Sequence, residues 1–212
     1  SGWCGPTTSE PRCRPQGWSD DPDLGHHVSR GRMAWNPTRA EHPMRGKWAQ
    51  GIVPRSFTWI IKDRIAVSER PGGCGDAHRR VRRQEEIIWI RENGFDSVLS
   101  LLASDHNLHN YDELEMAWSH IPFGGASDGL ACLEEVFRRI DELTTDGRRV
   151  LVHREELNDV VCGLMGAYLL RTGLAPTGPQ AMSIAEQLTG RPLGFPGREI
   201  VGLVAASGGS DG

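Results

Sequence analysis

Residues Arg149 to Arg171 read RVLVHREELNDVVCGLMGAYLLR, and this stretch decides the fold. The first four residues form a short apolar run that predicts a buried strand ending at His153. The segment after the loop has apolar and small side chains at helical spacing, which predicts a buried helix: Val160, Val161, Gly163, Leu164, Ala167, Tyr168 and Leu169. A strand, a tight loop and a helix start together favour an anion site, because the first helical amides lack partners.

The flanking sequence alternates between strand and helix patterns. Strands are expected at residues 58–61, 65–67, 97–101 and 118–121, and helices at residues 77–92, 110–117, 128–145, 176–189 and 196–206. This alternation predicts an α/β fold with a central, mainly parallel sheet of about four or five strands flanked by helices. We expect residues 150–152 to form the middle strand.

The strand, loop and helix resemble the signature of cysteine-dependent protein tyrosine and dual-specificity phosphatases, V-H-C-x-x-G-x-x-R-S/T-G followed by an apolar helix. With Val152 and His153 matched to the first two residues of the signature, Arg154 falls on the nucleophilic cysteine and Leu157 on the loop glycine. Val160 falls on the phosphate-binding arginine, and Val161 on the Ser/Thr that assists the leaving thiolate. The resemblance therefore implies the family's fold with each of these catalytic positions replaced.

Three other segments resemble the same family: residues 56–72, 86–102 and 117–123. Together with the strand, loop and helix, they extend the resemblance over roughly residues 55–206. The last of them resembles the strand before the general-acid loop, where the family has an aspartate two or three residues after the proline. Here Phe123 is followed by Gly124 and Gly125, and the first acid is Asp128, where we expect the cap of the next helix.

These replacements favour a pseudophosphatase, a catalytically inactive phosphatase-like protein that acts as a binding or regulatory module. The alternative is an active hydrolase of the superfamily with relocated chemistry, drawing on Cys162, Cys74 or Asp128. A cysteine nucleophile needs a lowered thiol pKa. Cys162 lies in the apolar helix, where burial raises that pKa, so the sequence disfavours the alternative.

The loop itself is acidic, since it carries Glu155, Glu156 and Asp159. A carboxylate about 5 Å from a phosphate charge costs roughly 3 kcal/mol at an effective dielectric constant near 20. We therefore expect an ordinary capped loop, in which Asn158 or Asp159 accepts hydrogen bonds from the helix amides. The same acids with His153 match no metal-binding spacing, so neither a metal ion nor a cofactor is expected.

A run of four arginines stands at the start of the expected helix 77–92, the unfavourable end for cations: Arg79, Arg80, Arg82 and Arg83. The run predicts either a solvated basic face paired with Glu85 and Glu86, or a docking patch for an acidic or phosphorylated protein partner. Arg70, in the preceding glycine-rich loop, is the other candidate anion contact.

Composition divides the chain into an arm, a domain and a tail. Residues 1–50 hold four of the seven tryptophans and show no helical or strand period, so we expect an irregular arm. Residues 51–206 form the expected domain and 207–212 a flexible tail. Cys4, Cys13, His26 and His27 lack zinc-ligand spacing.

Charge and hydropathy exclude several function classes. The 38% hydrophobic and 25% charged residues are typical of a soluble globular protein. No apolar run approaches the roughly 20 residues of a membrane span. The net charge of −4 gives no general reason to expect nucleic-acid binding. Five scattered cysteines make no disulfide framework, so we expect a cytoplasmic protein.

Overall fold

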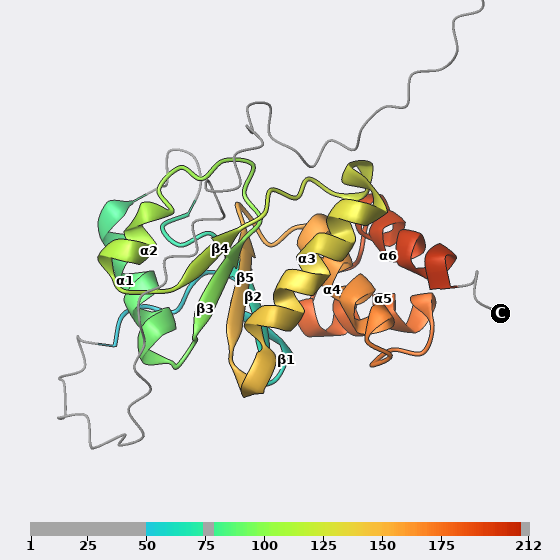
Figure 1. Ribbon diagram of the computed structural model, residues 1–212, viewed down its shortest axis with the longest axis horizontal. Coiled ribbons are helices and arrows are strands. Elements are labelled where there is room, and N and C mark those ends of the chain that lie inside the picture. Colours follow the sequence, from blue (N-terminus) through green and yellow to red (C-terminus); the bar gives the residue numbers. More distant parts are fainter. Residues whose placement is uncertain (1–49, 74–78, 209–212) are drawn as a thin grey trace, which may run out of the picture.

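The computed structural model describes residues 50–73 and 79–208, and the expected arm (but for residue 50), Cys74, His78 and residues 209–212 lie outside this part. Its helices and strands alternate as the sequence predicts (Figure 1). In chain order they are β1 (Thr58–Ile61), β2 (Ile65–Glu69), α1 (Arg80–Glu92), β3 (Ser97–Ser100), α2 (His109–Glu113), β4 (Trp118–His120), the 3₁₀ turn η3 (Ala126–Asp128), α3 (Gly129–Leu143), the 3₁₀ turn η4 (Thr145–Gly147), β5 (Val150–Arg154), α4 (Asp159–Arg171), α5 (Gly178–Thr189) and α6 (Phe195–Gly208).

The sheet has five strands in the order β1-β2-β5-β3-β4. β1 pairs antiparallel with β2, and the remaining neighbours are parallel. The expected central strand is confirmed, because β5 lies between β2 and β3. In this register Val152 stands beside Val67 on one side and Leu99 on the other. Both faces of the parallel strands are covered, which explains their nearly continuous apolar sequences.

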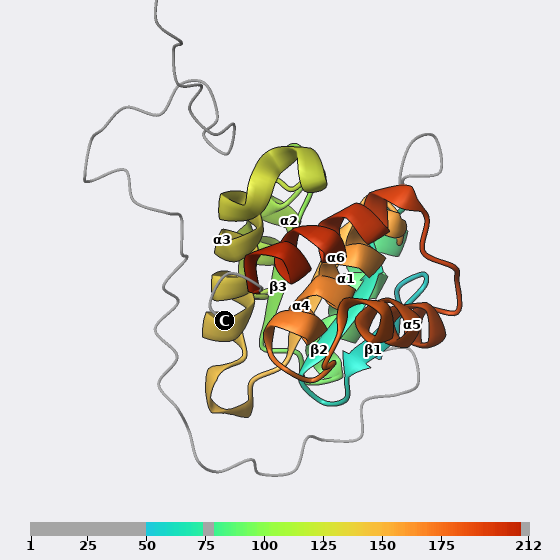
Figure 2. The same cartoon turned by 90° about the vertical axis from the view of Figure 1, so that its right-hand side faces the viewer.

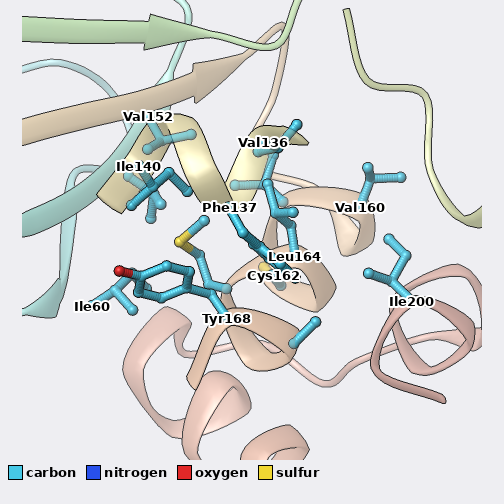
Figure 3. Packing of buried hydrophobic residues seen from close by; sticks show 14 of the residues in the cluster. Ile60, Val136, Phe137, Ile140, Val152, Val160, Cys162, Leu164, Tyr168 and Ile200 are labelled. Atoms are coloured by element: carbon cyan, nitrogen blue, oxygen red, sulfur yellow. The ribbon is translucent and has the colours of Figure 1, made fainter. Parts of the chain in front are cut away.

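Helices α1 and α2 cover one face of the sheet, and α3 and α4 cover the other (Figure 1). On that second side α5 contacts β1 and α6 packs against α4. Ala66, Leu151 and Val98 point toward α1 and α2. The alternate residues of the same strands point into the larger core, where Phe137 of α3 and Leu164 of α4 pack together (Figure 3). The period of two along each strand thus assigns every side chain to one of two cores.

Helix α4 is buried along ten of its thirteen residues and is crossed closely by α6 (Figure 2). The two backbones touch at Gly163 and Gly197, where an added β-carbon on Gly163 would overlap the backbone of Gly197. A side chain at either position would push the helices apart. This crossing fixes α4, and with it the loop that α4 follows.

Several element bounds differ from the expected ones by a few residues. The helix expected at residues 110–117 is only His109–Glu113, because the chain turns at Glu115 with a φ of 55°. The long helix is shortened to Gly129–Leu143 by a 3₁₀ turn at each end. α6 continues to Gly208 and so includes the first two residues of the expected tail.

Candidate functional site

The candidate site is the loop of residues 155–158 at the carboxyl end of the central strand. His153 is fully buried in β5, and the strand ends one residue later at Arg154. α4 then begins at Asp159. The predicted strand, loop and helix are therefore confirmed, at the edge of a parallel sheet where ligands of α/β proteins commonly bind.

The first amides of α4 are occupied by a side chain of the loop. Asn158 is the N-cap residue, and its Oδ1 accepts hydrogen bonds from the amides of Val160 at 3.1 Å and Val161 at 3.4 Å. This is the capped loop that the sequence predicts, with Asn158 rather than Asp159 as the cap. An anion at this helix start would have to displace the Asn158 carboxamide.

Two apolar side chains fill the positions that the resemblance assigns to phosphate binding. Leu157 is 4% exposed and Val160 is 9% exposed, and both belong to the larger core. Leu157 does not adopt a positive φ. Gly125 lies against Val160, because an added β-carbon there would contact its Cγ2 at 3.6 Å. The loop is thus closed by apolar packing where a phosphate-binding loop would be open and polar.

Arg70 joins this loop to the loop before α1. Its Nη1 donates to Glu155 Oε1 at 2.9 Å and Oε2 at 3.1 Å, and its Nη2 donates to the carbonyl of His106 at 2.8 Å. The sequence indicated Arg70 as a candidate contact but missed its partner. The two residues are 85 positions apart, so no local pattern could connect them.

His153 lies in a row of polar residues that crosses the sheet, of which Ser68, His153 and Ser100 are buried and His120 is partly buried. The strand register aligns Ser68, His153, Ser100 and His120 on neighbouring strands. From α2, Tyr111 Oη forms a 3.0 Å hydrogen bond with His153 Nε2. Burial, helped by the positive charge of Arg70, lowers the pKa of His153 to about 3. His153 is therefore neutral and has a structural role. Nothing in the sequence indicated that Tyr111 would be its hydrogen-bond partner.

The arginine run at the start of α1 divides into internal and exposed members. Arg82 pairs with the buried carboxylate of Glu86 at 2.7 Å. Arg83 is 7% exposed and donates to the side chain of Asn110 at 3.0 Å. Arg79 and Arg80 are exposed. The predicted pairing with Glu86 is confirmed for Arg82, while Arg79 and Arg80 remain open to solvent.

Asp128, the general-acid candidate, lies at the N-cap position of α3, as predicted. Its side chain caps no amide of α3. Instead, Oδ2 accepts a hydrogen bond from the amide of Gly124 and so closes the turn before the helix. Asp128 thus has a local structural role.

Cys162 and Cys132 are buried thiols. Burial raises the pKa of the Cys162 thiol, as the sequence predicts for a residue inside an apolar helix. A raised pKa reduces the thiolate fraction at neutral pH. In the described ranges, no three His, Cys, Asp or Glu side chains gather as a metal site would require.

A cavity of about 480 Å³ opens at the opposite end of α4 from the loop. Its walls include Leu170, Arg171, Pro176, Thr177 and Val204. Arg171 is already engaged there, because it pairs with Glu134 and Asp141. The cavity therefore belongs to the helical layer and not to the candidate site.

Comparison with known proteins finds no matching family model and no matching curated protein. Solved structures do match. Tk-PTP in its active form has a TM-score of 0.55 at 19% identity and covers 71% of this chain and 97% of its own. Kinase associated phosphatase has a TM-score of 0.57 at 15% identity, with coverages of 70% and 93%. Human DUSP28 has a TM-score of 0.55 at 15% identity, with coverages of 76% and 99%.

These likenesses show that the chain has a phosphatase-like fold, as the sequence predicts. At such low identity they show the fold alone. None of the helices within residues 50–73 and 79–208 combines the length and apolar composition needed to cross a membrane.

Proposed function

We propose that this protein is a pseudophosphatase, which uses a phosphatase-like fold as a non-catalytic module that binds a protein partner in the cytoplasm. The observation that carries the proposal is the loop after β5. It places Arg154 directly after His153, where the resemblance puts the nucleophilic cysteine. Its helix amides are taken by Asn158.

The chemistry of the family requires groups that this loop lacks. Covalent catalysis starts from a thiolate, and an arginine then stabilises the charge of the transition state. In this chain the corresponding residues are Arg154 and Val160. Glu155 and Glu156 add negative charge beside the place where phosphate would bind. These features together favour loss of turnover.

Neither Cys162 nor Asp128 supports the alternative of an active hydrolase with relocated catalytic residues. The Cys162 thiol is buried with a raised pKa, so it is a poor nucleophile. The Asp128 carboxylate is bound to the amide of Gly124. Cys74 lies outside the described residues.

The exposed arginines at the start of α1 support an acidic or phosphorylated protein as the partner. Arg79 and Arg80 crowd positive charge onto the end of a helix where cations are unfavourable by roughly 0.3–1 kcal/mol each. A negatively charged partner would turn that cost into a gain. The proposal therefore places partner binding on the α1 side of the sheet.

Hydrolysis of an aryl phosphate by the full chain tests the proposal. We expect a rate at the background of a buffer control for the wild type and for a variant in which all five cysteines are Ser. Turnover that a single Cys→Ser change abolishes would restore the active-hydrolase alternative. Turnover that survives all five changes would also overturn the proposal, because it would show catalysis that does not depend on cysteine.

A further inference from the structure

Exposed apolar side chains gather beside the first half of α1. In the described part of the chain six large apolar side chains are exposed, and three of them lie here: Ile52 at 49%, Val53 at 47% and Val81 at 70%. The amide of Ile52 donates to the carbonyl of Glu85 at 3.1 Å. Glu85 follows Val81 by one helical turn, so both lie on one face of α1. Such a cluster differs from the singly scattered apolar residues of ordinary surfaces.

Exposed arginines border these apolar side chains. Arg79 is the N-cap of α1 and Arg80 is its first residue, and both are exposed. The first turn of α1 has no acidic residue, and Glu85 is partly exposed one turn later. We call the combined feature the α1 surface, which comprises Ile52, Val53, Arg79, Arg80 and Val81. A complementary occupant would carry an apolar anchor together with several carboxylates.

The chain enters the described residues against this same surface. An added β-carbon on Gly51 would overlap the backbone of α1 at Glu85 and Trp89. Residues 1–49 contain five carboxylates: Glu10, Asp20, Asp21, Asp23 and Glu41. Three of the five follow Trp18 closely, in the sequence Trp-Ser-Asp-Asp-Pro-Asp of residues 18–23. No other tryptophan of residues 1–49 has a carboxylate within five positions. Residues 18–23 therefore match the chemistry that the α1 surface requires.

We propose that residues 18–23 dock on the α1 surface of their own chain. Trp18 would pack on the apolar side chains, and the three aspartates would lie beside Arg79 and Arg80. This docking does not depend on whether the protein has phosphatase activity. It adds to the proposed function that a partner on the α1 side must first displace residues 18–23, which makes them a built-in competitor.

The length of the intervening chain permits this contact. The 26 residues between Asp23 and Gln50 can extend to about 90 Å, whereas α1, with 13 residues, is only about 20 Å long. A short tether gives a local concentration on the order of 1 mM. A contact with a dissociation constant of about 0.1 mM would then be formed about ten times as often as it is open. One aromatic anchor and screened charge pairs therefore suffice.

Hydrogen exchange of the full chain at low ionic strength tests the docking, with the amides of residues 18–23 as the reporter. We expect Arg79→Gln with Arg80→Gln to speed their exchange about five- to tenfold relative to the wild type, because the docked state is lost. Arg191→Gln with Arg198→Gln is the matched control. It removes two exposed arginines from the α5 and α6 side and should leave the exchange unchanged. Equal rates in the wild type and the Arg79 and Arg80 variant would leave the α1 surface to a separate partner and overturn the proposal.

The apolar anchor has its own matched pair of variants. Trp18→Ala should speed exchange of the amides at residues 20–23, and Trp35→Ala should not, because no carboxylate accompanies Trp35. The same effect from both changes would overturn the assignment to residues 18–23. Both substitutions precede the described residues, so this comparison stands even if the arginine changes destabilise α1.

Exchanging the charges tests direct pairing. Asp20→Lys with Asp21→Lys should release the segment, and adding Arg79→Glu with Arg80→Glu should slow its exchange again. Failure of the second pair to restore slow exchange would contradict the pairing. Protection should also be independent of protein concentration. Protection that rises with concentration would assign the contact to a second copy and overturn the intramolecular docking. Turnover of an aryl phosphate would overturn the proposed function and leave these exchange rates unaffected, so the two failures can be told apart.

Discussion

The two faces of the sheet differ in what they bury. In the described part of the chain, the α1 and α2 side holds most of the buried polar and charged side chains: Ser68, Arg83, Glu86, Ser100, Asn110 and His153. The side covered by α3 and α4 holds the larger apolar core, part of which is shown in Figure 3. We infer that the apolar face supplies most of the stability, while the proposed partner binding would lie on the α1 side of the sheet.

The largest expected effect is on the apolar face. Phe137 is fully buried, and its ring lies 5.7 Å from that of Tyr168. Phe137→Ala should lower the free energy of unfolding by about 3–5 kcal/mol, through lost burial and the cavity left behind. Urea unfolding measures this. A loss below that of the polar-face variants would reverse the proposed division of roles.

The polar face should make stability depend on pH through His153. Its pKa is about 3 in the folded protein and about 6.5 when unfolded, so the unfolded state binds more protons between these values. Stability is therefore fully present above pH 6.5 and falls as the pH drops toward 3. Between pH 7.5 and pH 5 the wild type should lose roughly 2 kcal/mol more than His153→Gln.

Urea midpoints of the two proteins at both pH values measure this difference. Other groups titrate equally in both, so the comparison isolates His153. Parallel pH profiles would show that His153 is not held neutral.

A smaller loss is expected from the hydrogen bond between the polar row and α2. Tyr111→Phe removes the partner of His153 Nε2 while the ring stays buried. An unsatisfied buried polar group costs about 1–3 kcal/mol, and we expect the lower half of that range. In Tyr111→Phe, amide hydrogen exchange should become faster in α2 at conditions where α4 is still protected. Uniform loosening of both would argue against a separate polar-face unit.

The smallest effect concerns the cap that closes the loop. Asn158→Ala should destabilise the protein by about 1 kcal/mol, because two α4 amides lose their acceptor. Asn158→Asp keeps the acceptor and is the matched control, with little expected change. Thermal unfolding distinguishes them. Equal loss in both variants would mean that the cap contributes nothing specific.

The sequence predicted the apolar face better than the polar one. Periodicity identified β5 and α4 because their apolar residues are local and regular, as at Leu164 and Val152. The Arg70–Glu155 and Tyr111–His153 contacts join residues 85 and 42 positions apart. Such contacts depend on strand order and loop path, which no local pattern of a single sequence contains.

The roles of single residues were likewise predictable only where they depend on neighbours in the sequence. Asn158 could be predicted as a cap because capping is local to the helix start. Arg82 and Arg83 had identical local signals, yet Arg82 pairs on its own helix and Arg83 reaches Asn110 on α2. The arginine run therefore predicted a positively charged helix start, but it did not predict which of the arginines are buried and which are exposed.

Rebuilding the loop after β5 tests whether the phosphatase-like fold here has lost phosphatase chemistry. Arg154→Cys with Val160→Arg restores the nucleophile and clamp that the resemblance requires. We predict that this double variant hydrolyses an aryl phosphate no faster than the wild type. Glu155, Glu156 and Asp159 would still repel phosphate, and Leu157 would still fill the loop.

The matched comparison adds neutral residues at those three acids and Leu157→Gly. We expect hydrolysis to appear only with these additional changes. Robust hydrolysis by the double variant alone would contradict this expectation, because the charge and shape of the present loop would then be no barrier to catalysis.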